Sequence, residues 1–144
     1  MAYSVLDVAN KILAYGAERD GGELISNLKL QKLLYYMQGF YLAYFHESLF
    51  DEEIEAWQYG PVVPVVYEHY KDNGSAGISP SGQSLIFNLP KEETLFNEVF
   101  RVYGDYSAIG LMNLTHSEMP WKSTKIGDVI EKQKLNSFFG KRLK

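Results

Sequence analysis

The strongest constraint in this sequence is a helix, predicted from Ser26 or Asn27 to Phe45, that is apolar on most of its sides. At about 100° per residue, the large apolar side chains that fall within about 140° of one another are Leu30, Leu33, Leu34, Met37, Phe40, Tyr41, Tyr44 and Phe45. Tyr35 and Leu42 fall on the opposite side, so only narrow polar strips remain. Such a helix has to be covered by neighbours on more than one face. We therefore expect a mainly α fold, a compact single-domain helical bundle around this central helix.

The length and composition are consistent with one globular domain over residues 1–144. The chain has no cysteine, which excludes disulfides, thiolate zinc sites and a cysteine nucleophile. Its longest apolar run, Phe40 to Phe45, is far shorter than the ~20 residues that span a bilayer. The first residues lack the apolar core of a signal peptide, and Asp7 interrupts them. We expect a soluble, cytoplasmic protein with no membrane partner.

Apolar periodicity and turn residues predict the other elements. Further helices are expected over Ser4–Arg19, from Pro64 to before Asn73, from Leu89-Pro90 to Gly104, over Ser107–Thr115 and over Glu131–Phe139. Ser4 and Asp7 match a capping box, and Gly21-Gly22 is expected to end the first helix. Extended segments are expected at Glu53–Gln58, Leu85–Phe87 and Ile126–Ile130, with a surface loop over Gly74–Gln83.

A sharp turn is predicted at Tyr59-Gly60-Pro61, because Gly permits positive φ and Pro fixes its own φ. This turn makes a small β-hairpin or short sheet possible. The acidic segment before it contains Asp51 and Glu53. It lacks the glycine-bearing pattern of a calcium loop, which favours a solvated loop over a metal site.

No established catalytic, metal or cofactor motif is present. The glycines have the wrong spacing for a phosphate loop, and none of the histidines His46, His69 and His116 has metal-ligand spacing to another. His116 fits a helix cap or a core position better than a partner contact or a general base oriented by Glu118. We expect no metal, no cofactor and no enzymatic activity.

The two tryptophans each lie near a proline turn, Trp57 before Pro61 and Trp121 directly after Pro120. A tryptophan held there is either a wedge between core helices or an anchor for a partner. The charge is also uneven, because residues 1–120 hold 7 Lys and Arg against 16 Asp and Glu, whereas residues 121–144 hold 7 against 2. The basic end is either a solvated helix or a contact for an acidic partner or nucleic acid.

Several segments resemble the Panacea domain, which is also called the SocA-like antitoxin domain and occurs in phage-associated proteins. The first and longer match consists of Leu30-Gln31-Lys32-Leu33-Leu34-Tyr35-Tyr36, Leu49-Phe50, Glu55-Ala56-Trp57-Gln58-Tyr59-Gly60-Pro61-Val62-Val63-Pro64, Val66-Tyr67 and Tyr70. The second consists of Leu114-Thr115-His116 and Pro120-Trp121, and the closing segment of Ile130 and Phe138-Phe139. The resemblance covers nearly the whole chain and is weakest over Asp72 to Leu89.

The resemblance implies the antitoxin of a bacterial or prophage toxin–antitoxin module, which neutralises a cognate toxin encoded by an adjacent gene through direct protein–protein binding. A proteolytic adaptor that delivers the toxin to a cytosolic protease is the alternative. An enzyme using His116 and a nucleic-acid binder using Lys132 to Lys144 rank lower. The expected partner contacts are Asp51, Glu53, Trp57, Tyr59, Pro61, Val62, His116 and Trp121.

Overall fold

The computed structural model describes residues 2–19, 22 and 24–143. Its α-helices are α1 (Val5–Glu18), α2 (Asn27–Phe45), α3 (Pro64–Tyr70), α4 (Pro90–Tyr103), α5 (Ala108–His116), α6 (Met119–Lys122) and α7 (Lys132–Gly140). The strands are β1 (Ile25–Ser26), β2 (Glu55–Trp57), β3 (Gly60–Val62) and β4 (Gly77–Ile78), and a 3₁₀ turn, η1 (Lys71–Asn73), follows α3. Strands β1 and β4 form one antiparallel pair, and β2 and β3 form another. The expected mainly helical fold is confirmed.

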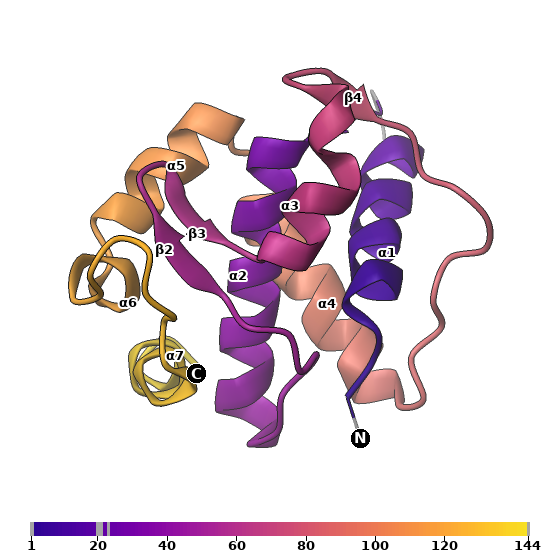
Figure 1. Cartoon of the computed structure of the whole chain (residues 1–144). Helices are drawn as coiled ribbons and strands as arrows, with labels where there is room; N and C mark the ends of the chain where they lie inside the picture. The colour runs from indigo at the N-terminus through magenta and orange to yellow at the C-terminus, as the bar shows by residue number, and fades with distance from the viewer. Residues whose placement is uncertain (1, 20–21, 23, 144) are drawn as a thin grey trace.

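Helix α2 is the centre of the molecule, as predicted. Helices α1, α3, α4, α5 and α7 all pack on it, and Figure 1 shows them arranged around it. Its start is fixed by Ser26, whose Oγ accepts a hydrogen bond from the Lys29 amide at 3.3 Å. The side chains of Tyr35 and Tyr36 are fully buried, so these tyrosines are core residues.

A glycine in the middle of α2 sets the close approach of α7. A Cβ atom on Gly39 would lie 2.2 Å from the ring of Phe139, which is less than any real carbon contact. Phe139 is completely buried and also contacts Tyr35 edge-on, with ring centroids 5.3 Å apart. The absence of a side chain at Gly39 therefore lets the last helix close the core.

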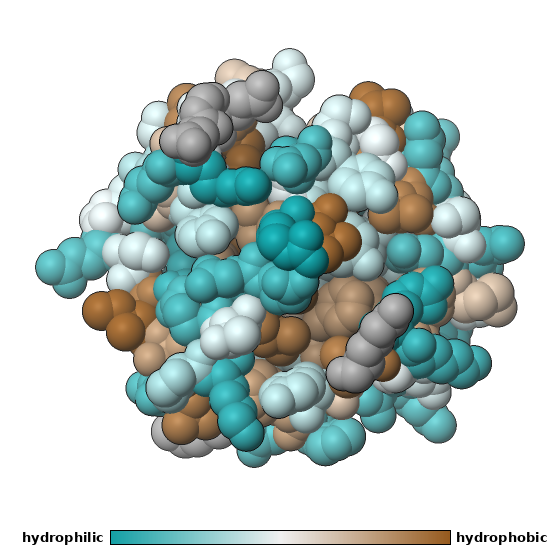
Figure 2. Space-filling view, turned by 180° about the vertical axis from the view of Figure 1, so that it is seen from behind, coloured by the Kyte–Doolittle hydropathy of each residue, from teal (hydrophilic) through white to brown (hydrophobic). Residues whose placement is uncertain are grey.

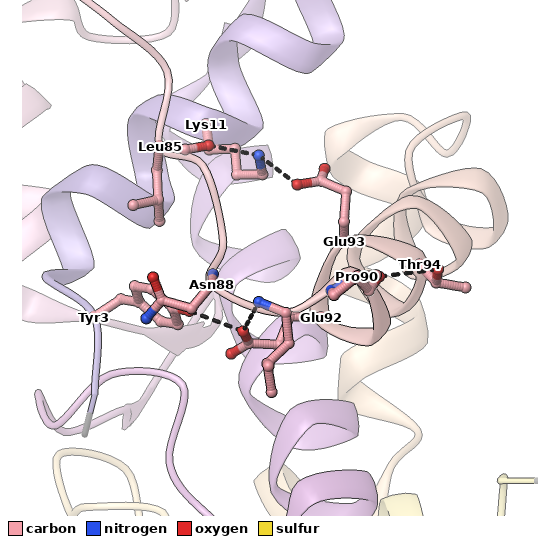
Figure 3. Close-up of polar contacts among 9 residues, drawn as sticks. Tyr3, Lys11, Leu85, Asn88, Pro90, Glu92, Glu93 and Thr94 are labelled. Carbon is pink, nitrogen blue, oxygen red and sulfur yellow. Dashed lines mark hydrogen bonds and ion pairs between the residues drawn. The ribbon is translucent and has the colours of Figure 1, made fainter.

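A long segment without regular structure, residues 79–89, is held by side chains from α1 and α4. The Lys11 ammonium donates to the Leu85 carbonyl at 2.6 Å and pairs with Glu93 at 3.1 Å. The buried Glu92 carboxylate accepts from the Tyr3 hydroxyl and the Leu89 amide, both at 2.9 Å. Figure 3 shows these contacts meeting at the start of α4.

The strand predicted at Leu85–Phe87 is wrong, because this stretch has no ladder partner. Lys11 takes the Leu85 carbonyl, and Ile86 is 83% exposed. Conversely, the loop predicted over Gly74–Gln83 contains β4, which pairs with β1.

The capping box predicted at the start of α1 is also wrong, because the Ser4 side chain makes no capping hydrogen bond. Gly21, expected to end this helix with Gly22, lies outside the described residues. Of the extended segment predicted over Ile126–Ile130, only the end is confirmed. Residues 126–128 turn, whereas Val129 bridges Glu55 and the Ile130 amide donates to the Ile54 carbonyl at 2.8 Å. The short helix α6 had no counterpart among the predictions.

Candidate partner-binding surface

The β2–β3 hairpin presents the most prominent aromatic residue of the predicted site. Trp57 pairs with Gly60 across the ladder, so Gln58 and Tyr59 form the connecting turn. Gly60 has φ +110°, a conformation that other residues rarely adopt. This turn leaves Tyr59 61% exposed. The predicted hairpin and its sharp turn are confirmed.

Helix α2 holds the hairpin from beneath through polar side chains. The Lys32 ammonium group donates to the Pro61 carbonyl at 3.1 Å, and Gln31 Oε1 accepts from the Val63 amide at 2.9 Å. Gln31 is itself oriented by a bond from its Nε2 to Asn27 Oδ1 at 2.8 Å. Each of these bonds satisfies a buried polar group, so together they fix the position and direction of β3 relative to α2.

Lys32 has an unusual electrostatic environment. Its side chain is fully buried, and a Cβ atom on Gly60 would lie 2.6 Å from its Cε. Burial disfavours the charged ammonium and lowers the pKa of Lys32 to about 7. The close fit under Gly60 explains why a flexible lysine stem, rather than a bulkier side chain, occupies this position.

The end of α5 and the short helix α6 hold the hairpin from the side. His116 Nε2 lies 3.1 Å from the Gln58 carbonyl oxygen, and the Trp121 indole N–H donates to the Trp57 carbonyl at 2.8 Å. The His116 and Trp121 rings contact each other, with centroids 4.2 Å apart. The two segments of the chain that carry the recognisable motifs are thus bonded to each other through the backbone of the hairpin.

Glu118 does not orient His116, although it is two residues away. Its buried carboxylate accepts hydrogen bonds from the hydroxyls of Tyr35 at 2.9 Å and Tyr36 at 3.0 Å. Burial raises the pKa of Glu118, and these two hydrogen bonds partly oppose that rise. The carboxylate therefore ties α6 to the central helix, whereas His116 contacts the Gln58 carbonyl and the Trp121 ring.

The predicted partner-binding residues fall into three groups. Asp51, Glu53 and Tyr59 are exposed, and Trp57, His116 and Trp121 are half-buried. Pro61 and Val62 are buried against the interior. The structure brings Trp57, Tyr59, His116 and Trp121 together, and we call these four residues the hairpin surface. Asp51 and Glu53 precede β2, at the end of the hairpin away from the turn (Figure 1).

Sequence reasoning missed the residues that support this surface. Gln31 and Lys32 are polar residues of the central helix that were not predicted to support the hairpin, and both are buried. The signal was available, because a lysine inside an otherwise apolar central helix needs a buried acceptor. Tyr67 was missed as well, and its ring contacts Trp57 edge-on at 5.1 Å.

Among residues 2–19, 22 and 24–143, no group of three His, Asp or Glu residues is placed to hold a metal ion. None of the helices over the same residues combines the length and hydropathy needed to cross a bilayer.

Comparison with known proteins identifies the family. Residues 30–122 match the model of the family described as "Antitoxin SocA-like, Panacea domain". The chain is 36% identical over 126 residues to "Antitoxin SocA" of Caulobacter vibrioides. The aligned region covers 79% of this chain and 66% of that relative, which is just under two thirds of the relative's length. No solved structure matches. The matched region contains most of α2, the hairpin, and helices α5 and α6 that hold it, and the chain therefore belongs to the SocA-like antitoxin family with a Panacea domain.

Proposed function

We propose that this protein is an antitoxin that neutralises a cognate toxin by binding it directly through the hairpin surface. The toxin is encoded by an adjacent gene of a bacterial or prophage module, and the complex forms in the cytoplasm. Family membership supports the antitoxin role, and the chemistry of the hairpin surface supports the binding site.

The observation that carries the proposal is an exposed tyrosine on a rigidly held turn. Tyr59 is 61% exposed, while hydrogen bonds from Lys32 and Trp121 hold the two strands and one from His116 holds the turn itself. Tyrosine and tryptophan are enriched among the few residues that carry most of the binding energy at protein interfaces. A surface fixed before binding loses less conformational entropy when the partner arrives.

The half-buried residues extend this contact. Trp57 donates its indole N–H to the Glu55 carboxylate at 2.9 Å and rests on Tyr67, so the ring is held in one orientation. Asp51 and Glu53 are exposed and add negative charge to the segment that leads into β2. The chemistry fits a toxin surface with an apolar pocket and basic residues around it.

Co-expression tests the antitoxin role. The adjacent gene is expressed from an inducible promoter alone, with this protein, and with a variant carrying Tyr59→Ala. We expect growth arrest with the toxin alone, rescue by the wild type and weaker rescue by the variant. A toxin that still arrests growth in the presence of wild-type protein would contradict the antitoxin role.

The same strains separate direct neutralisation from delivery to a protease. Direct neutralisation predicts that the half-life of the toxin stays the same or lengthens when this protein is present. Faster loss of the toxin, dependent on a cytosolic protease, would favour the adaptor role instead.

A further inference from the structure

An apolar groove lies on the face of the molecule opposite the hairpin. Figure 2 shows this face, with an apolar area hollowed between hydrophilic side chains near its centre. The groove has a volume of about 730 Å³ and lies between the end of α2, the outer side of α4 and the C-terminal residues. Its main apolar residues are Phe40, Tyr44, Leu95, Val99 and Val102.

The groove is open and elongated. Val102 is 42% exposed and Tyr44 is 46% exposed, so its walls remain in contact with water. Lys91 lines it near the start of α4 and Val102 near the end, a separation of eleven residues or about 16 Å along a helix. That length accommodates about three turns of a second helix.

The charged residues at the groove leave a net positive rim. Glu98 forms an ion pair with Arg101 and neutralises it. Lys91 and Arg142 form no salt bridge with any carboxylate in the described part of the chain. Arg142 lies over the Phe138 ring at 3.7 Å and donates to the Phe138 carbonyl at 3.4 Å, which leaves most of its guanidinium donors available.

We propose that this groove binds an amphipathic helix of a partner protein, with acidic residues beside its apolar stripe. Apolar side chains at positions i, i+3 or i+4, and i+7 would enter the groove. Carboxylates on either side would meet Lys91 and Arg142.

A bound helix fits this groove better than a bound strand, because the backbone around the groove offers few free hydrogen-bonding groups. Most of the groove is walled by α2 and α4, whose backbone groups bond within their own helices, and Arg142 and Leu143 complete it. An added strand would find no free ladder to complete, whereas a helix satisfies its own backbone bonds. This site is separate from the hairpin surface and does not depend on the identity of the toxin.

Binding of designed peptides tests the groove directly. The probe is a fluorescein-labelled helical peptide of about 16 residues with leucines at the stated spacing and glutamates beside them. One control replaces the glutamates with lysines, and the other scrambles the leucines. Fluorescence anisotropy is expected to give a Kd at least about tenfold lower for the acidic peptide than for either control, with weaker binding as salt is raised.

Matched variants locate the binding. Val102→Glu places a like charge in the groove at a partly exposed position and is expected to weaken binding of the acidic peptide at least about tenfold. Ile86→Glu, at an 83% exposed position outside the groove, is expected to leave binding unchanged. A double variant with Lys91→Glu and Arg142→Glu is expected to favour the lysine peptide. Thermal melting checks that each variant is folded.

Three results would overturn the proposal. The first is absence of binding by the acidic peptide. The second is equal binding of the scrambled or lysine peptide, or binding that survives Val102→Glu. The third is a concentration-dependent dimer, seen by sedimentation, that is lost in Val102→Glu, because it would assign the groove to a second copy of this chain.

Discussion

Lys32 is the residue whose chemistry departs most from its ordinary state. Its pKa is lowered to about 7 by burial, whereas the same side chain in the unfolded chain keeps a pKa near 10.5. Between these two values the unfolded chain binds the proton and the folded chain does not. The free energy of unfolding therefore rises with pH across this window, by up to about 1.4 kcal/mol per pH unit. Below the folded pKa both states are protonated, and this pH dependence ends.

Replacing Lys32→Met removes this titration and keeps an unbranched side chain under Gly60. We expect the free energy of unfolding of the variant to rise less steeply between about pH 7 and pH 9 than that of the wild type. Chemical denaturation at several pH values measures both slopes. Equal slopes in the two proteins would mean that Lys32 stays protonated in the folded state.

Sequence motifs account for part of the arrangement around the hairpin, and the rest requires the fold. The motifs directed the prediction to Trp57, Tyr59, His116 and Trp121, and the structure bonds Trp121 to Trp57 and His116 to Gln58, the residue before Tyr59. Burial of Pro61 and Val62 could not be deduced, because a three-residue strand carries too little alternation to assign its faces. The partners of Lys32 and Glu118 also required the fold, since they lie on segments distant in sequence.

At the scale of elements, α2 depends on glycine as much as on its apolar residues. Gly39→Ala would place a Cβ atom 2.2 Å from the Phe139 ring, and both the ring and α7 would have to move. We expect a loss of about 2 kcal/mol or more in the free energy of unfolding, in the range of overpacked cores. Chemical denaturation measures this loss.

Gly140→Ala is the matched control, because nothing lies within 4 Å of a Cβ atom at that position in α7. We expect a change within about 1 kcal/mol and in the stabilising direction, since alanine favours the helix. Equal destabilisation by both substitutions would contradict the account of how α7 packs on α2.

The sequence predicts best those elements whose structure is determined by residues close to one another in the chain. Helix α2 has an apolar periodicity over several turns and a capping serine. Strands β1 and β4 are two residues each and pair across about fifty residues, so no local pattern specifies them. The apolar run Leu85–Phe87 resembled a strand, but the Leu85 carbonyl accepts its hydrogen bond from Lys11 of α1 and not from a neighbouring strand.

At the scale of the molecule, the proposed encounter with the toxin is electrostatic in its first step. The net charge of −4 arises from a strongly acidic body and a basic C-terminal end. A basic toxin would be steered toward the acidic residues beside the hairpin, and salt would screen that attraction.

We therefore expect the association rate constant with the toxin to fall as salt is raised, with a smaller change in the dissociation rate. A double variant with Asp51→Asn and Glu53→Gln should associate more slowly at low salt and show a weaker salt dependence. Stopped-flow fluorescence measures both rates. An association rate that is independent of salt would exclude this steering.

The central claim is that the hairpin surface binds the toxin, and the dissociation constant of the Tyr59→Ala variant tests it most directly. Tyr59 is 61% exposed, so its removal should leave the melting temperature nearly unchanged. The account predicts a Kd for the toxin about 30-fold higher than that of the wild type, equivalent to about 2 kcal/mol. Ile86→Ala, at an exposed position away from the hairpin, should bind like the wild type. A folded Tyr59→Ala variant that binds the toxin with unchanged affinity would contradict the account.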